Sequence, residues 1–281
     1  MNIEACLYIV ATPIGNLGDI TLRAVETLKK ADLIAAEDTR HSQRLMNHLG
    51  VSARLLSLHE HNEREKSQAI IDKVKEGQSI ALVSDAGTPL ISDPGYFLVK
   101  LAQEQGVKVV PIPGVSAVVT ALSVSGLPSD RFVFEGFLPA KSGNKQRVLE
   151  LFKYESRTVI FYESPHRIVD TLEAMLTVFG EDRRLVLARE LTKTFETIKG
   201  DSLGLLCEWV KSDANQQRGE FVLLLEGATD TPEESVVDQD KMLALLIAEL
   251  PIKKASKIVS EITGANKKDL YQRALEMQGK V

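Results

Sequence analysis

Long hydrophobic runs are missing from this 281-residue chain. The longest fall well short of the roughly 20 apolar residues that a membrane-spanning helix needs. The first residues also lack the basic region and apolar core of a secretory signal peptide. Cysteine is scarce, since only Cys6 and Cys207 occur, far apart and in apolar settings, which favours two reduced thiols over a disulfide. These absences predict a globular protein of the cytoplasm without a membrane segment.

Several familiar binding motifs are missing as well. No cysteines and histidines have the spacing of a zinc site, and His59 and His61 have no second ligand pair nearby, so no metal is predicted. The segment 11–21 (ATPIGNLGDIT) is neither a GxGxxG turn nor a Walker A loop. Dinucleotide and nucleoside triphosphate sites therefore lose support. The net charge of −5 argues against binding nucleic acid by bulk charge alone.

Short apolar strands alternate with amphipathic helices through the first half of the chain. This rhythm predicts parallel βαβ units with right-handed crossovers. The expected strands are 7–11, 33–36, 55–58, 80–83 and 107–111. The expected helices are 21–30, 41–49, 63–76, 96–105 and 115–124.

A turn-rich segment at 126–130 (GLPSD) marks a domain boundary, and a second α/β region follows. Its expected strands are 132–137, 158–162, 185–188, 195–199 and 221–226, and its expected helices are 145–154, 165–179 and 203–211. The two strands flanking Lys193 indicate that antiparallel pairing enters here. The fold class is therefore α/β, with an N-terminal domain at 1–125, a second domain at 126–227 and a cleft between them.

The last part of the chain has a different composition. Residues 228–240 are acidic and contain Pro232, as is typical of a linker. Beyond them, 241–281 reads as three short basic helices at 241–249, 253–262 and 267–277. Two interpretations stay open for this tail: a unit like a helix-turn-helix, or a helical cap on the main body.

The segment 84–95 (SDAGTPLISDPG) is the most informative loop. It follows the apolar run 79–83, so it lies at the carboxyl end of a predicted parallel strand, where open α/β sheets bind ligands. Three further loops, 11–21, 35–41 (AAEDTRH) and 111–117 (PIPGVSA), follow strands of the same half. We expect the four loops to line one site.

The four loops together resemble the tetrapyrrole methylase superfamily, whose members are S-adenosylmethionine-dependent methyltransferases with two α/β domains. Long motifs resemble one bacterial branch in particular: ATPIGNL, AEDTR, SDAGTP, FYESPHR and ARELTK. That branch methylates the ribose 2′-oxygen of a cytidine in the decoding region of 16S ribosomal RNA. Tetrapyrrole enzymes usually carry Gly-Asp-Pro where this chain has Ser84-Asp85-Ala86, which favours the RNA branch.

The resemblance implies a cofactor, S-adenosyl-L-methionine, and the residues around it. The implied cofactor-binding residues are Ile14, Asp85, Gly87, Thr88, Ser116, Ala117, Tyr162, Ala188, Gly219 and Glu220. Asp85 gains the sharpest role, whereas residues 93–95 are interpreted as the turn that starts the next helix. The resemblance also implies a homodimer.

Methyl transfer to a ribose oxygen needs alignment of the reacting atoms and a group that accepts the hydroxyl proton. The candidates are four groups at loop ends, with no single base assigned: Asp38, Glu163, Glu190 and Lys193. Lys193 would need a lowered pKa, through burial or neighbouring cations such as Arg189. Glu163 with Arg167, and Arg189 with Glu190, could also be plain ion pairs.

The expected partner is 16S ribosomal RNA or the small ribosomal subunit. The candidate RNA-binding residues are Arg40, Lys141, Lys145, Arg147, His166, Arg167, Lys253 and Lys254. Two alternatives stay open: methylation of a corrin or sirohaem precursor, and a non-catalytic RNA-binding assembly factor. A phosphate-handling hydrolase has less support, because Asp85 and Asp93 have no nucleophile and base paired nearby.

Overall fold

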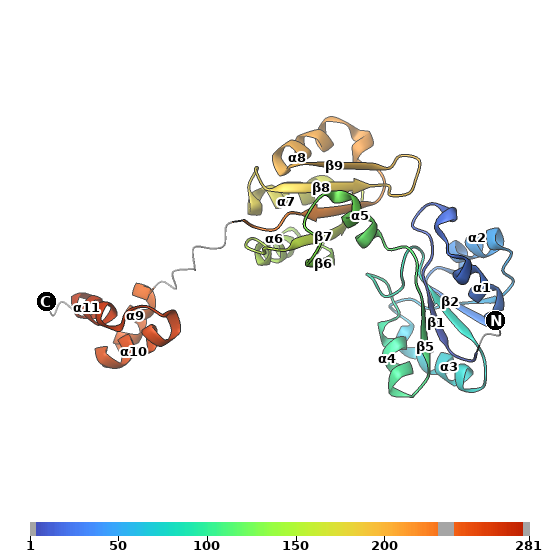
Figure 1. Ribbon diagram of the computed structural model, residues 1–281, viewed down its shortest axis with the longest axis horizontal. Coiled ribbons are helices and arrows are strands. Elements are labelled where there is room, and N and C mark those ends of the chain that lie inside the picture. The colour runs from blue at the N-terminus through green and yellow to red at the C-terminus, as the bar shows by residue number, and fades with distance from the viewer. Residues whose placement is uncertain (1–3, 230–238, 278–281) are drawn as a thin grey trace. The chain divides into compact units, whose positions relative to one another are not determined.

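The computed structural model describes residues 4–229 and 239–277. The chain forms two compact units, Met1–Gly227 and Ala228–Val281, drawn in Figure 1 from blue to red along the sequence. Each unit is described by itself. Most of the predicted linker 228–240 lies outside the described residues.

The first sheet of the larger unit is entirely parallel, as predicted. It is built from β1 (Leu7–Val10), β2 (Leu33–Ala36), β3 (Arg54–Ser57), β4 (Ile80–Val83) and β5 (Val109–Ile112) in the order β3-β2-β4-β1-β5. The helices between them are α1 (Leu22–Lys30), α2 (Thr39–Leu49), α3 (Glu63–Lys75) and α4 (Tyr96–Glu104). Apolar clusters cover both faces of this sheet, which explains why its central strands are nearly continuous apolar runs.

The second sheet is mixed. Its strands are β6 (Phe132–Phe137), β7 (Thr158–Glu163), β8 (Arg184–Arg189), β9 (Thr197–Ser202) and β10 (Phe221–Leu225), in the order β6-β7-β10-β8-β9. Only β6 and β7 pair in parallel, and the other three pairs are antiparallel. The predicted antiparallel pairing around Lys193 is confirmed by β8 and β9. Its helices are α6 (Ser142–Leu151), α7 (Ile168–Phe179) and α8 (Leu203–Ser212).

Two predicted elements are displaced for identifiable reasons. The strand expected at 195–199 begins at Thr197, because successive turns, closed by Lys193 N–H to Glu190 and Glu196 N–H to Lys193, occupy the preceding residues. The helix expected at 145–154 begins at Ser142 and ends at Leu151. The first turn of that helix is polar, so the apolar pattern alone placed its start too late.

Helix α5 (Ala117–Ser125) connects the two sheets. It precedes the expected boundary at 126, yet Val118, Ala121 and Leu122 pack with residues of β7, β8 and β10 in one apolar cluster. Figure 1 shows this helix beside the second sheet. Ile14 of the first loop joins the same cluster, so the apolar contact between the halves includes the first candidate loop.

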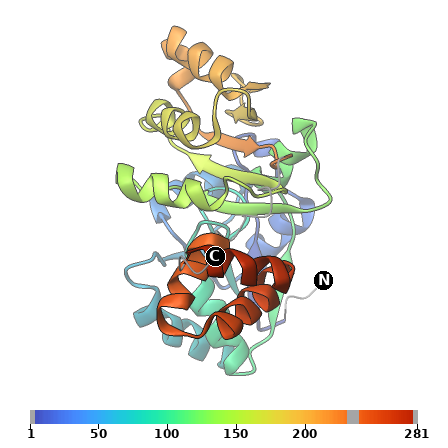
Figure 2. The ribbon, with the colours of Figure 1, turned by 90° about the vertical axis from the view of Figure 1, so that its left-hand side faces the viewer.

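The smaller unit contains α9 (Gln239–Glu249), α10 (Ile252–Thr263) and α11 (Lys267–Met277). They surround their own core, made of Leu243, Ala255, Val259, Leu270 and Ala274, and Figure 2 shows them packed together. Asn266 starts the third helix by accepting a hydrogen bond from the Lys268 N–H (2.9 Å), as expected of an N-cap.

Within the described parts of the chain, no helix combines the length and the apolar character needed to cross a membrane.

Candidate active site

The larger unit contains a cavity of about 540 Å³, within the range of small-molecule sites, roughly 300–1,000 Å³. Its walls come from the ends of strands in both sheets. The described lining residues are Ile14, Glu37, Asp85, Ala86, Gly87, Thr88, Ile91, Ser92, Asp93, Ser116, Ala117, Phe137, Tyr162, Glu163, Ser164, Pro165, Leu191, Glu220, Phe221 and Val222. All four expected loops of the first half thus meet at one site, the loop 35–41 through Glu37.

Hydrogen bonds join the loops of the first half into one floor. Thr12 and Gly87 exchange two backbone hydrogen bonds, of 2.8 and 3.0 Å, in an isolated antiparallel bridge. The Thr88 hydroxyl donates to the carbonyl of Val115 (2.9 Å). Because each loop is held by another, the floor is set before a ligand arrives.

Two glycines permit this close approach. Gly87 has a φ of +81°, in the left-handed region that favours glycine, and a Cβ there would lie 3.4 Å from Ile14 Cγ2. Gly114 packs on Ala11, whose Cβ would lie 2.9 Å from an added Cβ. A side chain at Gly114 would force the loops apart, whereas a side chain at Gly87 would strain the backbone because of its positive φ.

Three carboxyl groups of the first half face the cavity: Glu37, Asp85 and Asp93. Asp85 Oδ1 accepts a hydrogen bond from the Asp38 N–H (3.1 Å), so it also holds the loop after β2. Burial raises the pKa of Asp93 to about 6, which a hydrogen bond with Ser84 moderates and the charge of Asp85 reinforces. Burial, with the charges of Asp93 and Asp85, raises the pKa of Glu37.

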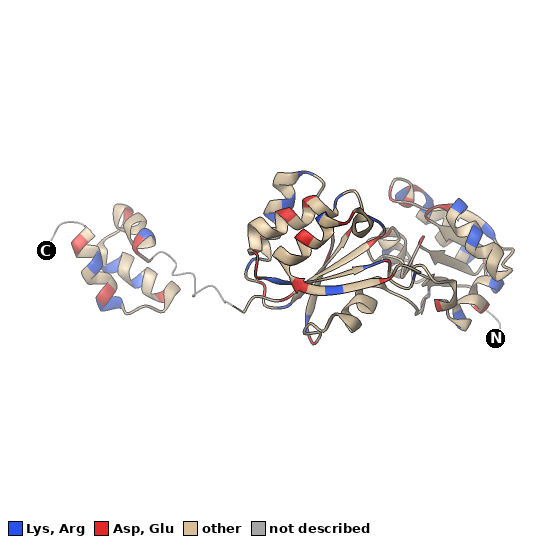
Figure 3. Cartoon of the chain, turned by 90° about the horizontal axis from the view of Figure 1, so that it is seen from above, with Lys and Arg blue, Asp and Glu red and all other residues tan. Residues whose placement is uncertain are grey.

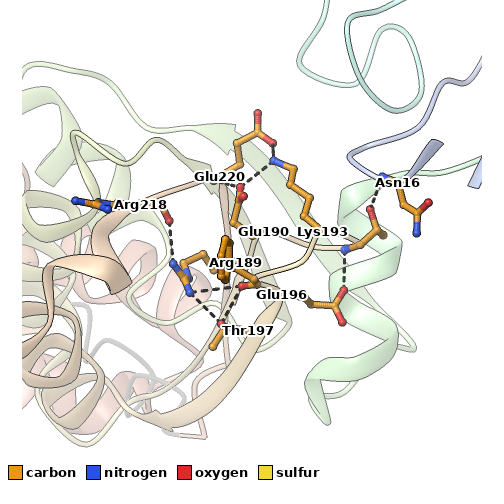
Figure 4. A network of polar contacts seen from close by, with 10 residues as sticks. Asn16, Arg189, Glu190, Lys193, Glu196, Thr197, Arg218 and Glu220 are labelled. Atoms are coloured by element: carbon orange, nitrogen blue, oxygen red, sulfur yellow. Dashed lines mark hydrogen bonds and ion pairs between the residues drawn. The ribbon is translucent and has the colours of Figure 1, made fainter. Parts of the chain in front are cut away.

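A network of charged side chains lies in the second half, after β8 (Figure 4). Lys193 Nζ lies 2.8 Å from Glu190 Oε1 and 2.8 Å from Glu220 Oε2. Burial alone would lower the pKa of Lys193, but the hydrogen bonds to these carboxylates outweigh it and raise the pKa. The prediction that Lys193 has the lowered pKa needed by a lysine base is therefore wrong.

The same turn reaches the first loop. The Thr192 hydroxyl accepts a hydrogen bond from the Asn16 N–H (3.1 Å), and Asn16 is labelled at the right of Figure 4. A Cβ at Gly15 would lie 2.5 Å from Lys193 Cγ. Glu190 and Thr192 have φ values of +52° and +65°, a region that costs non-glycine residues about 1–3 kcal/mol each. This strained turn therefore holds the first candidate loop, residues 11–21, from the side of the second sheet.

The predicted ion pair between Arg189 and Glu190 does not form. Arg189 also does not lower the pKa of Lys193, which is raised. Its guanidinium donates to the carbonyls of Asn215 (2.6 Å) and Phe195 (3.4 Å) and to the Thr197 hydroxyl (3.1 Å). It therefore fastens the segments on either side of the turn.

A buried polar network lies behind the cavity wall. Lys145 Nζ donates to Thr171 Oγ1 (2.9 Å), and that hydroxyl donates to Glu163 Oε2 (2.7 Å). Arg167 Nε lies 3.4 Å from Glu163 Oε1, which confirms the predicted ion pair. Only 4% of Lys145 is exposed, so its predicted contact with RNA is wrong. The helical pattern had not indicated that its position faces α7.

Eight of the ten expected cofactor residues line the cavity. Ala188 is fully buried in the apolar cluster beneath α5 and does not line it. Gly219, with a φ of +89°, lies against the Glu190 side chain instead. Among the expected bases, only Glu163 is in the wall, while Asp38 caps α2 and pairs with the exposed Arg40 (3.3 Å).

The remaining RNA candidates lie on the surface. Lys141, Arg147 and His166 are exposed, Arg167 is partly buried, and Lys253 and Lys254 are exposed on the smaller unit. In Figure 3, both basic and acidic positions are coloured on the ribbon of the tail helices. Among the cavity residues that the sequence reasoning missed are Glu37, Asp93 and Phe137. Asp93 lay within the loop already singled out, but its turn-like neighbours hid its direction.

The charge of the lining is one-sided. Its five ionisable carboxyl groups are Glu37, Asp85, Asp93, Glu163 and Glu220, and no lysine or arginine is among the described residues that line the cavity. Within the same described residues, no group of histidine, cysteine, aspartate and glutamate could hold a metal ion. The site is therefore suited to a ligand that carries positive charge and a neutral reacting partner.

Comparison with known proteins agrees with this architecture. Residues 6–206 match the family of tetrapyrrole (corrin/porphyrin) methylases, and the chain belongs to that family. Residues 233–278 match a second family, the RsmI C-terminal HTH domain.

The full chain is similar to two curated bacterial proteins, each named ribosomal RNA small subunit methyltransferase I. The protein of Escherichia coli O157:H7 is 56% identical over 278 residues, covering 99% of this chain and 97% of that protein. The protein of Pseudomonas aeruginosa is 54% identical over 276 residues, covering 98% of each.

Solved structures share the fold at low identity. A diphthine synthase has a TM-score of 0.59 at 18% identity, covering 78% of this chain and 89% of that one. A uroporphyrin-III C-methyltransferase from Thermus thermophilus, complexed with S-adenosylhomocysteine, has a TM-score of 0.55 at 18% identity, covering 79% and 97%.

Proposed function

We propose that this protein is an S-adenosylmethionine-dependent methyltransferase of the small ribosomal subunit, and that it methylates the ribose 2′-oxygen of a cytidine in the decoding region of 16S ribosomal RNA. Support comes from full-length relatives that bear the name ribosomal RNA small subunit methyltransferase I. The cytidine and its 2′-oxygen are implied by the motifs shared with that branch.

The observation that carries the proposal is the acidic, cation-free lining of the cavity. S-adenosylmethionine supplies an electrophilic methyl group on a cationic sulfonium. Its methionine part also carries an ammonium and one carboxylate, so the cofactor is positively charged overall. Asp85, with the loop around Gly87 and Thr88, and Glu220 would hold these charges, while Ile14, Ser116 and Ala117 leave room against the floor. These carboxylates would therefore attract the positive charges of the cofactor.

The same lining argues against a tetrapyrrole precursor. Corrin and sirohaem precursors carry several peripheral carboxylates. The lining would repel them, because within the described residues only two of its five carboxyl groups, Glu163 and Glu220, have a basic partner, Arg167 and Lys193. A nucleoside is uncharged apart from its phosphates. RNA therefore fits if one nucleoside enters and its phosphates stay at the rim.

An aromatic side chain marks the place for the base. Phe137 is 53% exposed although it lines the cavity, and its ring centroid lies 5.5 Å from that of Tyr162. Splayed, single-stranded bases commonly stack on such exposed rings. We assign Phe137 as the stacking face for the target cytosine, with its ribose directed inward.

The test is methyl transfer from labelled S-adenosylmethionine to small subunits that lack the modification, followed by mapping of ribose methylation. Asp85→Asn keeps a hydrogen-bond acceptor for the Asp38 N–H but loses the charge, so weaker cofactor binding in this variant would tie the charge to the cofactor. Methylation of a corrin precursor instead would favour the tetrapyrrole alternative. Tight subunit binding without methyl incorporation would favour a non-catalytic assembly factor.

The partner assignments belong to the same proposal. We place the protein in the cytoplasm, where ribosomes are assembled, and as a homodimer, which sedimentation equilibrium would test. The tail helices would add RNA affinity through Lys253 and Lys254, which are exposed at the start of α10.

A further inference from the structure

Most of the acid–base groups near the cavity are already engaged. Asp38 is bonded to Arg40, whose hydrogen bonds lower the pKa of that carboxyl. Glu190 is bonded to Lys193, and although burial opposes it, the pKa of Glu190 is lowered. Each group is therefore a weaker proton acceptor than it would be alone.

Glu163 is also engaged, although it lines the cavity. Its carboxylate is fully buried and accepts hydrogen bonds from the Ser164 N–H (2.8 Å) and the Thr171 hydroxyl (2.7 Å), with Arg167 beside it. A carboxylate with these partners holds the wall in place. It has little capacity left to receive a proton from a substrate.

Asp93 and Glu37 differ from the others. Both line the cavity, and within the described residues neither forms an ion pair with a lysine, arginine or histidine. Besides burial, Ser84 and Asp85 influence the pKa of Asp93. The pKa of Glu37 is influenced by a set of carboxyl groups that includes Asp93. No cation offsets their charge.

The loop that carries Asp93 is strained in a way that fixes its course. Leu90 and Ser92 have φ values of +75° and +65°, which are costly for residues with a Cβ. Gly95 packs so closely that a Cβ there would lie 2.7 Å from Leu82 Cδ2. Strain of this kind is common at functional sites, and here it fixes the backbone on both sides of Asp93.

Asp93 also acts across the cavity. Burial, followed by the charge of Asp93, raises the pKa of Tyr162 to about 12, which places the carboxylate within electrostatic reach of β7. Tyr162 in turn contacts Phe137, the exposed ring at the mouth. Glu37 is influenced instead by Asp38 and Glu60, on the side of the first sheet. A Cβ at Gly136, the residue before Phe137, would lie 3.0 Å from Ser92 Oγ, so the loop that carries Asp93 lies against the strand that carries the ring of the proposed nucleoside site.

We propose that the Asp93 carboxylate is the catalytic group that accepts the proton of the ribose 2′-hydroxyl during methyl transfer. This inference rests on the proposed function and adds to it the group that the sequence left unassigned. The ribose oxygen forms its bond to the methyl carbon as the carbon–sulfur bond breaks, and that electron pair stays on the sulfur as a neutral thioether. The O–H bond breaks and its proton passes to an Asp93 oxygen, from which water later removes it.

The environment suits this role at neutral pH. Its pKa of about 6 leaves Asp93 ionised, yet makes it a stronger base than an ordinary aspartate. The titratable groups that face it are Asp85 on its own loop, Glu37 after β2 and Tyr162 on β7. None of these groups is a cation that would pair with the Asp93 carboxylate and lower its pKa.

The experiment compares wild type, Asp93→Asn, Asp93→Glu and Glu37→Gln in single-turnover methylation of unmodified small subunits between pH 5 and 9. Calorimetry measures S-adenosylmethionine affinity for each protein. We expect Asp93→Asn to lower the rate constant by about 10²–10⁴-fold, with cofactor affinity and RNA KM within about twofold of wild type. It should also remove the rise in rate through pH 6, which Glu37→Gln should retain, and Asp93→Glu should recover part of the rate.

Three results would overturn the assignment: a wild-type rate in Asp93→Asn, a rise through pH 6 that persists in it, or a loss explained by weaker cofactor binding. If Glu37→Gln, and not Asp93→Asn, lowers the rate and removes the rise through pH 6, Glu37 is the group that accepts the proton. Failure of the proposed function looks different, because the wild-type protein would then methylate no ribose at any pH.

Discussion

Replacing Asp93 by asparagine should stabilise the larger unit at neutral pH. Because the pKa of Asp93 is raised from 3.8 to about 6, ionisation of this group lowers the free energy of unfolding. Two pKa units correspond to about 3 kcal/mol at most. Because the carboxyl is only partly buried, solvent screening reduces this figure, and we expect Asp93→Asn to gain about 1–2 kcal/mol at pH 8.

The sign of the pH dependence follows from the same shift. Between the unfolded pKa, near 4, and the folded pKa, about 6, the folded state binds more protons, so wild-type stability falls as pH rises. Below pH 4 the carboxyl is protonated in both states and the advantage of asparagine disappears. The difference between variant and wild type should therefore grow from pH 4 to pH 7 and then level off.

Urea unfolding followed by tryptophan fluorescence measures this directly. The chain has one tryptophan, Trp209 in α8, so the signal reports the larger unit alone. Asp32→Asn is the matched control, because hydrogen bonds from the Ser79 N–H and hydroxyl (2.7 Å each) lower the pKa of Asp32. That variant should be less stable than wild type by an amount that is constant above about pH 4 and disappears as pH falls below it. A pH-independent difference for Asp93→Asn, or a loss at pH 8, would refute the reasoning.

Three further predictions concern binding. Phe137→Ala should raise RNA KM by about 5- to 150-fold in steady-state assays, since stacking contributes roughly 1–3 kcal/mol, without changing cofactor affinity. Thr192→Val removes the hydroxyl that holds the first loop and should weaken cofactor binding about 2- to 10-fold by calorimetry, whereas Thr177→Val on α7 should not. Reversing both charges of Lys253 and Lys254 should weaken RNA binding and lower its salt dependence by about one to two in log–log slope; an unchanged slope would exclude these lysines from phosphate contacts.

Most strands of the larger unit were predictable because they are short apolar runs between turn residues, whereas the polar β9 was displaced from its expected place. The run at 80–83 becomes β4 with the predicted bounds, and the loop after it lies at the cavity because carboxyl ends of parallel strands share one edge. The packing of α5 on the second sheet was not predictable, since an apolar helix between two sheets has no local signal for the one it covers.

The chemistry of the site was less predictable than its position. Lys193 meets Glu220, which is 27 residues away along the chain, and Lys145 meets Thr171, which is 26 residues away. Neither contact leaves a trace in local pattern, so Lys193 was predicted as a candidate base and Lys145 as an RNA contact. Asp93 was passed over for the converse reason, because Pro94 and Gly95 beside it are typical of a turn.

An acidic cavity and an RNA substrate are compatible only under one geometry. Phosphates would be repelled by the five carboxyl groups of the lining, so the chain on either side of the target must stay outside while one nucleoside enters. Such a nucleotide must be unstacked, which costs least where RNA is single-stranded. The acidic groups of the lining thus divide three tasks: Asp85 and Glu220 would hold the cationic cofactor, the lining as a whole would exclude the RNA backbone, and Asp93 would take the proton.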